Sequence, residues 1–131
     1  MGVIATAKGV GMSPRKVGVV ADLVRGRTVA DAMVILSHTP RRSAGPVMKV
    51  IQSAKANADY NHNYKPDSLR IIEISVTPGA SLKRMRPAAR GRANPFQRRT
   101  SHIRVVVDGI VRAPKKAIVE ATEKTTKKET K

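Results

Sequence analysis

Residues 78–101 read PGASLKRMRPAARGRANPFQRRTS and carry seven Lys or Arg side chains without a single Asp or Glu. The large apolar residues among them are Leu82, Met85 and Phe96, which are too few to form a core. Like charges at this density repel one another, and packing them together would gain little. The segment therefore predicts an exposed basic arm that is neutralised by a polyanion, of which a phosphate backbone is the commonest.

Both flanks of this arm have the pattern of β-strands. Residues 70–76 (RIIEISV) and 102–107 (HIRVVV) alternate apolar side chains and are rich in β-branched residues. A structureless loop of this length would be unusual inside a compact domain. We therefore expect both strands to continue outward as one long hairpin over about residues 70–108. The side chains expected on its buried face are Ile72, Ile74, Val76, Ile103, Val105 and Val107.

The N-terminal part predicts an extended segment and a helix. Residues 3–11 are small and apolar with two glycines, which favours an irregular edge strand. Ser13 is a good N-cap and Pro14 suits the first helical position. Gly26 then provides a left-handed end for this helix.

Two further helices are predicted before the hairpin. Thr28 and Asp31 form a capping-box-like pair at the start of a short helix that ends before Pro40. The next apolar pattern is the longest, and its start contains a proline, which would break a helix interior. We therefore place Pro46 in the first turn of the third helix, with Ser43 as its cap.

Together these elements predict an α+β fold in which three helices pack on a small antiparallel sheet with a long protruding β-hairpin. The chain has 131 residues, which is the size of one domain. We assign residues 1–112 to a single nucleic-acid-binding domain. Residues 113–131 are rich in Lys, Thr and Glu and are expected to form a basic, disordered tail.

The whole chain is strongly basic. It holds 26 Lys or Arg against 9 Asp or Glu, a net charge of +17, and residues 1–112 alone hold 20 against 6. Such a charge favours nucleic acid as the partner over an anionic membrane surface. The chain contains two Tyr, one Phe and no Trp, so base-stacking platforms are not expected. Recognition should depend on the nucleic-acid backbone and its shape.

The sequence does not indicate an enzyme, a metalloprotein or a membrane protein. Ser101 and His102 are adjacent, so on a strand they would point to opposite faces rather than form a catalytic pair. The chain lacks Cys, and His38, His62 and His102 have no metal-ligand spacing. No apolar run approaches the roughly 20 residues of a bilayer-spanning helix. We expect no catalysis, cofactor, metal, small-molecule substrate or membrane anchor.

Candidate nucleic-acid contacts lie in the arm and near the N-terminus. Arginine predominates in the arm, and its planar fork suits bidentate contact with phosphate. Residues 8–16 (KGVGMSPRK) lead from glycines into a helix, which fits a structural cap, an RNA phosphate contact or, with the weakest support, a mononucleotide pocket. The candidate contacts are Lys8, Arg15, Lys16, Arg25, Lys83, Arg84, Arg86, Arg90, Arg92, Arg98, Arg99, Ser101 and His102.

Several motifs resemble the family of large-subunit ribosomal protein twenty-two. Residues 83–93 (KRMRPAARGRA) and 98–103 (RRTSHI) resemble the hairpin signature of that family. Residues 13–16 (SPRK), 20–26 (VADLVRG) and 53–58 (SAKANA) are also similar to it in order and spacing. The resemblance covers nearly all of the chain before the tail.

The resemblance implies a structural constituent of the large ribosomal subunit that binds large-subunit rRNA, aids subunit assembly and catalyses no reaction. The implied partners are this rRNA, neighbouring ribosomal proteins and the nascent polypeptide, and the implied location is the large ribosomal subunit in the cytoplasm. The hairpin tip would line the polypeptide exit tunnel. The corresponding residues are Arg84, Met85, Arg86, Pro87, Ala88, Ala89, Arg90, Gly91 and Arg92.

Two positions depart from the pattern of that family. Ala88 stands where many relatives have a basic residue, which removes one charged contact at the tip. Pro95 and Phe96 occupy a stretch that is usually more strand-like. Because proline cannot donate to a β-ladder, we expect the hairpin to be bulged or broken near Pro95.

Two other functions fit a basic chain less well. A DNA-binding protein would use the short helices as a helix-turn-helix, but the charge lies on the strand arm rather than on a recognition helix. A membrane-active peptide would need a broad apolar face opposite its cations, and residues 78–101 lack one.

Overall fold

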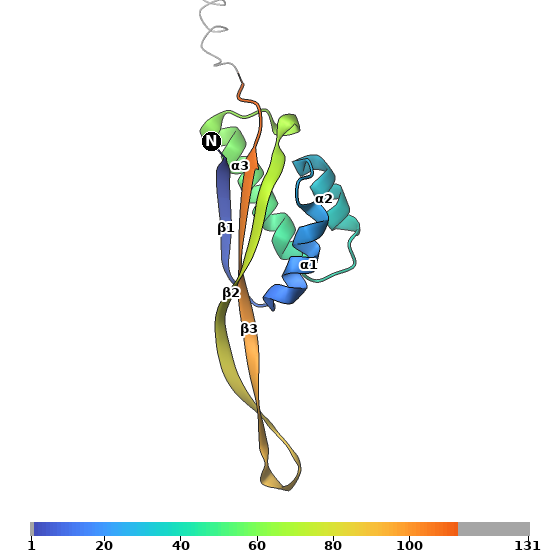
Figure 1. The fold of residues 1–131 in the computed structure, drawn as a ribbon, viewed down its shortest axis with the longest axis vertical. Coiled ribbons are helices and arrows are strands. Elements are labelled where there is room, and N and C mark those ends of the chain that lie inside the picture. The colour runs from blue at the N-terminus through green and yellow to red at the C-terminus, as the bar shows by residue number, and fades with distance from the viewer. Residues whose placement is uncertain (1, 113–131) are drawn as a thin grey trace, which may run out of the picture.

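The computed structural model describes residues 2–112, which form a layer of helices on one face of a three-stranded antiparallel sheet (Figure 1). The strands are β1 (Val3–Val10), β2 (Arg70–Pro87) and β3 (Ala93–Asp108). Their spatial order is β1-β3-β2, so β3 is the central strand and the other two are edges. The predicted α+β fold with a protruding hairpin is confirmed. The predicted disordered tail falls on residues 113–131, which lie outside the described residues.

Three helices within the described residues cover the inner face of the sheet. They are α1 (Pro14–Val24), α2 (Val29–His38) and α3 (Ala44–His62). Helix α3 packs on β1 and β3, α1 packs mainly on β2, and α2 packs on α3 and α1. Short 3-10 turns, Pro66–Ser68 and Ala89–Gly91, lie before β2 and at the hairpin tip.

The helices start where the sequence predicts, but only one of the three cap residues makes a side-chain cap bond. The Thr28 hydroxyl accepts a hydrogen bond from the Asp31 amide at 3.2 Å and donates one to the Asp31 carboxylate at 2.7 Å, which confirms the predicted pair. Ser13 and Ser43 stand at the N-cap positions but make no side-chain cap bond. The Ser43 hydroxyl instead donates to the Lys16 carbonyl at 3.2 Å and so joins the start of α3 to α1.

The core lies between the sheet and the helices. Alternate residues of β3, namely Ile103, Val105 and Val107, are fully buried, as predicted. They pack with buried side chains of all three helices, among them Val17 and Ile51. Because the opposite sheet face bears no helix, all of this burial is on one side of β3.

The prediction that Ile72 belongs to the core is wrong. Ile72 is 58% exposed, whereas Ile71 and Ile74 are 1% and 2% exposed. The pairing of β2 with β3 shifts register between Ile71 and Glu73, so Ile72 is an extra residue in a β-bulge. The bulge places Ile71 and Ile74 on the same face although they are three residues apart. Val76 is partly buried against the core.

Candidate nucleic-acid interface

The hairpin is a two-stranded ribbon that leaves the body of the protein (Figure 1). Strand β1 ends at Val10, opposite Ser101, and β2 and β3 continue without it to the pair Pro87 and Ala93. Every residue from 81 to 99 is exposed. The ribbon therefore offers both faces and both edges to a partner.

The tip closes in a tight turn. The Ala88 amide donates to the Arg92 carbonyl at 2.7 Å. Arg90 and Gly91 have φ angles of 57° and 69°, in the left-handed region that a glycine adopts readily and an arginine seldom does. The turn thus presents the Arg90 side chain at the end of the ribbon.

The expected break near Pro95 does not occur. Strand β3 runs through Pro95, which pairs with Met85. The bond from Ala88 to Arg92 marks a hydrogen-bonded pair, and alternation along an antiparallel ladder makes Met85 and Pro95 a non-hydrogen-bonded pair. The backbone nitrogen of Pro95 therefore faces the open edge of the ribbon. The ladder loses no hydrogen bond through the lack of an N–H at this position.

The register irregularity lies instead at the root of the hairpin, which we define as residues 78–81 and 100–102. Both edge strands shift register beside the partner of Ser101, β1 between Ala7 and Val10 and β2 between Pro78 and Ser81. Bulges bend a strand and increase its twist. On the β2 side, the Thr100 hydroxyl donates to the Ala80 carbonyl at 2.7 Å and bridges the shift.

The arm cations occupy both faces of the ribbon. Register and strand alternation place Arg84, Arg86 and Arg98 on one face and Lys83 and Arg99 on the other. Arg90 and Arg92 lie at the tip. A ribbon that is cationic on both faces suits insertion between phosphate backbones better than contact with one flat anionic surface.

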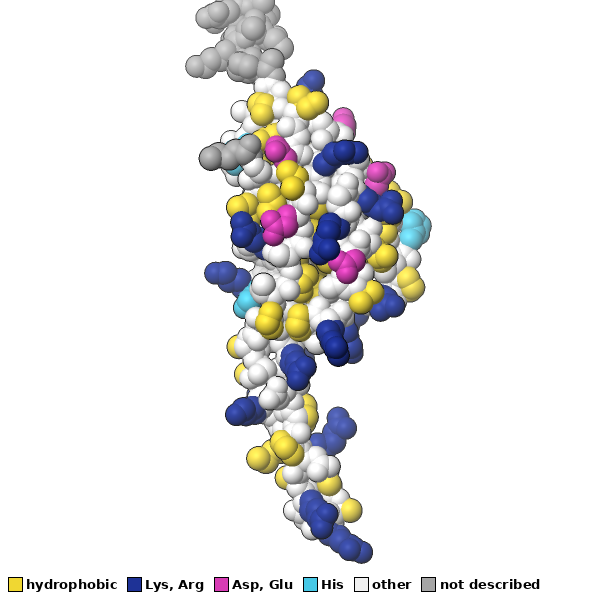
Figure 2. Space-filling view, viewed as in Figure 1, with side chains coloured by type: hydrophobic (Ala, Val, Ile, Leu, Met, Phe, Trp, Pro, Cys, Tyr) yellow, Lys and Arg dark blue, Asp and Glu magenta, His cyan; other side chains and the backbone are white. Residues whose placement is uncertain are grey.

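These cations have no acidic partner within residues 2–112. The ion pairs of this part of the chain join Arg25 to Asp22 and Arg112 to Asp59, both on the body. Figure 2 shows Lys and Arg side chains along the hairpin, whereas the Asp and Glu side chains on this face lie on the body. The described residues leave the charge of the hairpin without a counterion, which favours an anionic partner.

A basic cleft lies where the hairpin meets the body. It has a volume of about 510 Å³ and is lined by Lys16 of α1, Arg42 of the loop before α3, and Arg99 of β3. The cleft also includes Ser13 at the start of α1. The structure thus brings together two predicted contacts, Lys16 and Arg99, and adds Arg42, which sequence reasoning missed. The adjacent arginines Arg41 and Arg42, in the loop between α2 and α3, are the sequence signal that could have predicted this contact.

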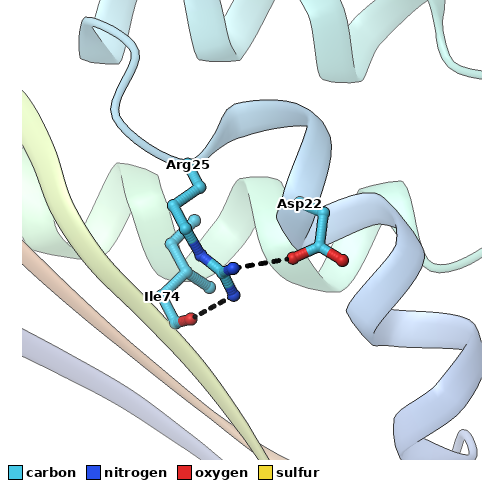
Figure 3. A network of polar contacts seen from close by, with 3 residues as sticks. All are labelled: Asp22, Arg25 and Ile74. Carbon is cyan, nitrogen blue, oxygen red and sulfur yellow. Dashed lines mark hydrogen bonds and ion pairs between the residues drawn. The ribbon is translucent and has the colours of Figure 1, made fainter.

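Other predicted contacts lie apart from this cleft. Lys8 is exposed on the edge strand β1, and Arg15 is exposed on the first turn of α1. The guanidinium group of Arg25 lies 3.1 Å from the Asp22 carboxylate and donates to the Ile74 carbonyl at 3.2 Å (Figure 3). Arg25 therefore joins the end of α1 to the edge strand β2, and its charge is shared with Asp22.

Two candidates in the hairpin root have structural environments. The Ser101 side chain is fully buried and its hydroxyl has no hydrogen-bond partner in the described part of the chain. A side chain without accessible surface cannot contact RNA, so the prediction for Ser101 is wrong. His102 is half-buried, and its Nδ1 accepts a hydrogen bond from the Gly9 amide at 2.9 Å. The remaining Nε2 is the nitrogen available to a ligand.

Metal-binding and membrane-spanning features are not found in the described residues. In this part of the chain, no three His, Asp or Glu side chains gather as a metal site. None of the helices α1, α2 and α3 is long and apolar enough to cross a membrane. The candidate binding surface of these residues is the basic hairpin with the adjoining cleft.

The sequence matches the family model described as ribosomal protein L22p/L17e over residues 5–108. It is 52% identical over 103 residues to the large ribosomal subunit protein uL22 of Desulfitobacterium hafniense, covering 79% of this chain and 90% of that protein. The uL22 protein of Oceanobacillus iheyensis is 52% identical over 79% of this chain and 91% of its own length. That of Clostridioides difficile is 50% identical, with 79% and 93% covered. On this evidence, the chain belongs to the ribosomal protein L22p/L17e family.

Proposed function

We propose that this protein is a structural constituent of the large ribosomal subunit that binds large-subunit rRNA through its hairpin. The observation that carries the proposal is a ribbon of exposed cations on both faces, without an acidic partner in residues 2–112. Phosphate groups of folded RNA on either side of the ribbon would neutralise these charges. Binding in this way would also fix the two segments of RNA relative to each other, which would aid subunit assembly.

We further infer that residues 84–92, the end of the ribbon, line the tunnel through which the nascent polypeptide leaves. Support comes from the family membership and from the narrow exposed turn that presents Arg90. The body, seated on RNA through the cleft of Lys16, Arg42 and Arg99, would hold the ribbon in place.

A helix-turn-helix DNA-binding protein is less well supported. Helix α2, which would be the recognition helix, reads VADAMVILSH and contains no Lys or Arg. Its buried residues Val29, Ala32 and Leu36 face the core. A helix of this composition lacks the basic side chains that contact phosphate and guanine.

The rRNA proposal is tested by the salt dependence of binding to transcribed large-subunit rRNA. Replacing Arg98 and Arg99 with Ala should weaken binding and reduce the slope of log affinity against log salt by about 0.7–0.9 for each phosphate that the variant no longer neutralises. Lys49 and Lys55 of α3 provide a double Ala control with the same change in net charge. An equal slope for the two double variants would exclude the arginines as contacts.

Membership of the subunit and the tunnel position need tests in cells. A tagged chain should co-sediment with the large subunit in a sucrose gradient and remain there after a high-salt wash. Because the chain has no Cys, Arg90→Cys introduces a single thiol at the tip. This thiol should cross-link to a Cys in a stalled nascent chain, and Lys55→Cys on the body should not. Absence of a cross-link from both positions would contradict the tunnel assignment.

A further inference from the structure

His102 lies on the open face of β3, at the root of the hairpin. Alternation along β3 turns Ser101 and Ile103 towards the helices, where both are fully buried, and turns His102 to the face that bears no helix. His102 is paired with Thr77 of β2 across the ladder. The imidazole therefore stands where the three-stranded sheet narrows to the two-stranded ribbon.

One ring nitrogen of His102 is already used inside the protein. The Gly9 amide donates a hydrogen bond to Nδ1 at 2.9 Å. A ring nitrogen that accepts a hydrogen bond carries no proton, so the proton of the ring is on the other nitrogen, Nε2. The contact with Gly9 thus fixes the tautomer in which Nε2 is an N–H donor.

This N–H donor has no partner in the part of the chain that the structure describes. In residues 2–112, the bond from Gly9 is the only hydrogen bond of the His102 side chain. Ser101 Oγ is the one buried side-chain nitrogen or oxygen of these residues without a partner, so Nε2 is not a buried atom. Gly79 of β2 places no side chain beside it, since a Cβ there would lie 3.2 Å from Nε2. The nitrogen is therefore open to a ligand.

Two cations flank the donor on the same face of β3. The extra residues of both register shifts belong to β1 and β2, so the alternation of β3 continues through the root. It places Arg98 and Arg104 on the face of His102. Both arginines are exposed, and neither forms an ion pair within residues 2–112. Positive charge on both sides of the donor favours an anionic oxygen as its acceptor.

From these observations we propose that His102 donates a hydrogen bond from Nε2 to a phosphate oxygen of the RNA backbone, with Gly9 as the positioning residue that fixes the tautomer. The proposal rests on the proposed rRNA contact of the hairpin and adds an uncharged contact on the open face of its root. A neutral donor neutralises no phosphate, so it releases no counterion. The contact would position the RNA without adding to the salt dependence of binding.

Two amide substitutions separate the roles of the two ring nitrogens. His102→Asn places a carbonyl oxygen near the position of Nδ1, where it can accept from Gly9, and removes the Nε2 donor. His102→Gln extends an N–H donor towards the position of Nε2 and removes the ring acceptor. The full chain is titrated with transcribed large-subunit rRNA at several salt concentrations, and urea unfolding gives the stability of each variant. His62→Asn, at the exposed end of α3, is the matched control.

His102→Asn is expected to bind about three- to tenfold more weakly than the parent chain, as the loss of one hydrogen bond does. Its salt slope and its stability should equal those of the parent chain. His102→Gln should bind like the parent chain although it is less stable, and His62→Asn should match the parent chain in both measurements. In the free protein, proton–nitrogen correlation spectra of the imidazole rings in mildly alkaline buffer should show His102 protonated on Nε2. This set of results would support the donor.

Four results would overturn the proposal. Parent-like affinity of His102→Asn would remove the contact, and equally weak binding by His102→Gln would assign the effect to the shape of the root. A reduced salt slope for His102→Asn would mean that the ring binds as a cation. A ring proton on Nδ1 would contradict the bond from Gly9.

Each of these results leaves the rRNA proposal intact as long as the Arg98 and Arg99 double variant shows its reduced salt slope. Failure of the rRNA proposal is a separate result, in which that slope equals that of the Lys49 and Lys55 control.

Discussion

The backbone amide of Gly9 on β1 donates a hydrogen bond of 2.9 Å to Nδ1 of His102 on β3. Gly9 has a φ of 70°, in the left-handed region, and lies within the register shift between Ala7 and Val10. The strand leaves the regular ladder at this point, so a side chain replaces the ladder bond that the Gly9 amide would otherwise make. The contact ties the end of the edge strand to the root of the hairpin.

Removing this hydrogen bond should destabilise the protein measurably. His102→Ala removes the acceptor, and we expect the free energy of unfolding to fall by about 1 kcal/mol, the usual net value of such a bond. Urea unfolding followed by circular dichroism measures the change. His38→Ala, at an exposed histidine of α2, is the control. Equal stability of the two variants would mean that the bond from Gly9 contributes nothing.

The bulge in β2 makes opposite predictions for two neighbouring isoleucines. Ile74→Ala should lower the free energy of unfolding by about 2–5 kcal/mol, because Ile74 is 2% exposed and its truncation leaves a cavity. Ile72→Ala should cost less than about 1 kcal/mol, because Ile72 is 58% exposed. Chemical denaturation of both variants is the measurement. A larger effect for Ile72 would show that the strand lacks the bulge and has the register expected from simple alternation.

The hairpin root should not tolerate a side chain at Gly79. A Cβ at this position would lie 2.5 Å from Thr100 Oγ1 and 3.1 Å from His102 Cε1. Gly79→Ala must therefore displace the Thr100 hydroxyl from its bond to Ala80, at an expected cost of about 1–3 kcal/mol.

Gly11→Ala is the control for this substitution, since a Cβ at Gly11 would meet no atom within 4 Å. Melting temperatures of the two variants test the difference, and amide hydrogen exchange shows whether opening is confined to the root. Wild-type stability of Gly79→Ala, with unchanged exchange at Thr100, would contradict the close packing.

The protein should lose stability in acid partly through Asp108. The Gly109 amide donates to the Asp108 carboxylate at 2.8 Å, and this bond lowers the pKa of Asp108 below its usual 3.8. A hydrogen bond from Tyr64 acts in the same direction. Because the folded state holds the Asp108 proton less tightly than the unfolded chain, the resulting stability is present above about pH 4 and is lost as the pH falls below it.

Asp108→Asn should therefore flatten the acid limb of stability against pH, although it also lowers stability near neutral pH. Urea midpoints measured at a series of pH values give the two curves. Asp67→Asn, which removes one carboxylate from the nearby 3-10 turn, is the control with the same change in charge. An acid limb as steep in Asp108→Asn as in the parent chain would remove Asp108 from the explanation.

Local patterns in the sequence were sufficient to predict the helices, the strands and the basic arm. The pair Thr28 and Asp31 begins α2 as predicted because both partners of a helix cap lie within four residues. The basic arm was evident from composition, since seven like charges without a counterion cannot be buried whatever the fold. Strand pairing over the whole arm followed from the alternation on its two flanks.

Only the tertiary structure decided which side chains the surface offers. Pairing with β3 puts the extra residue of β2 at Ile72, and folding brings Arg42 to Lys16 and Arg99, which are distant from one another in sequence. Burial removes Ser101 from the surface. Alternation and charge are properties of neighbouring residues and can be read along a chain. Register and burial depend on free energies shared between segments far apart in sequence, and these exist only once the chain has folded.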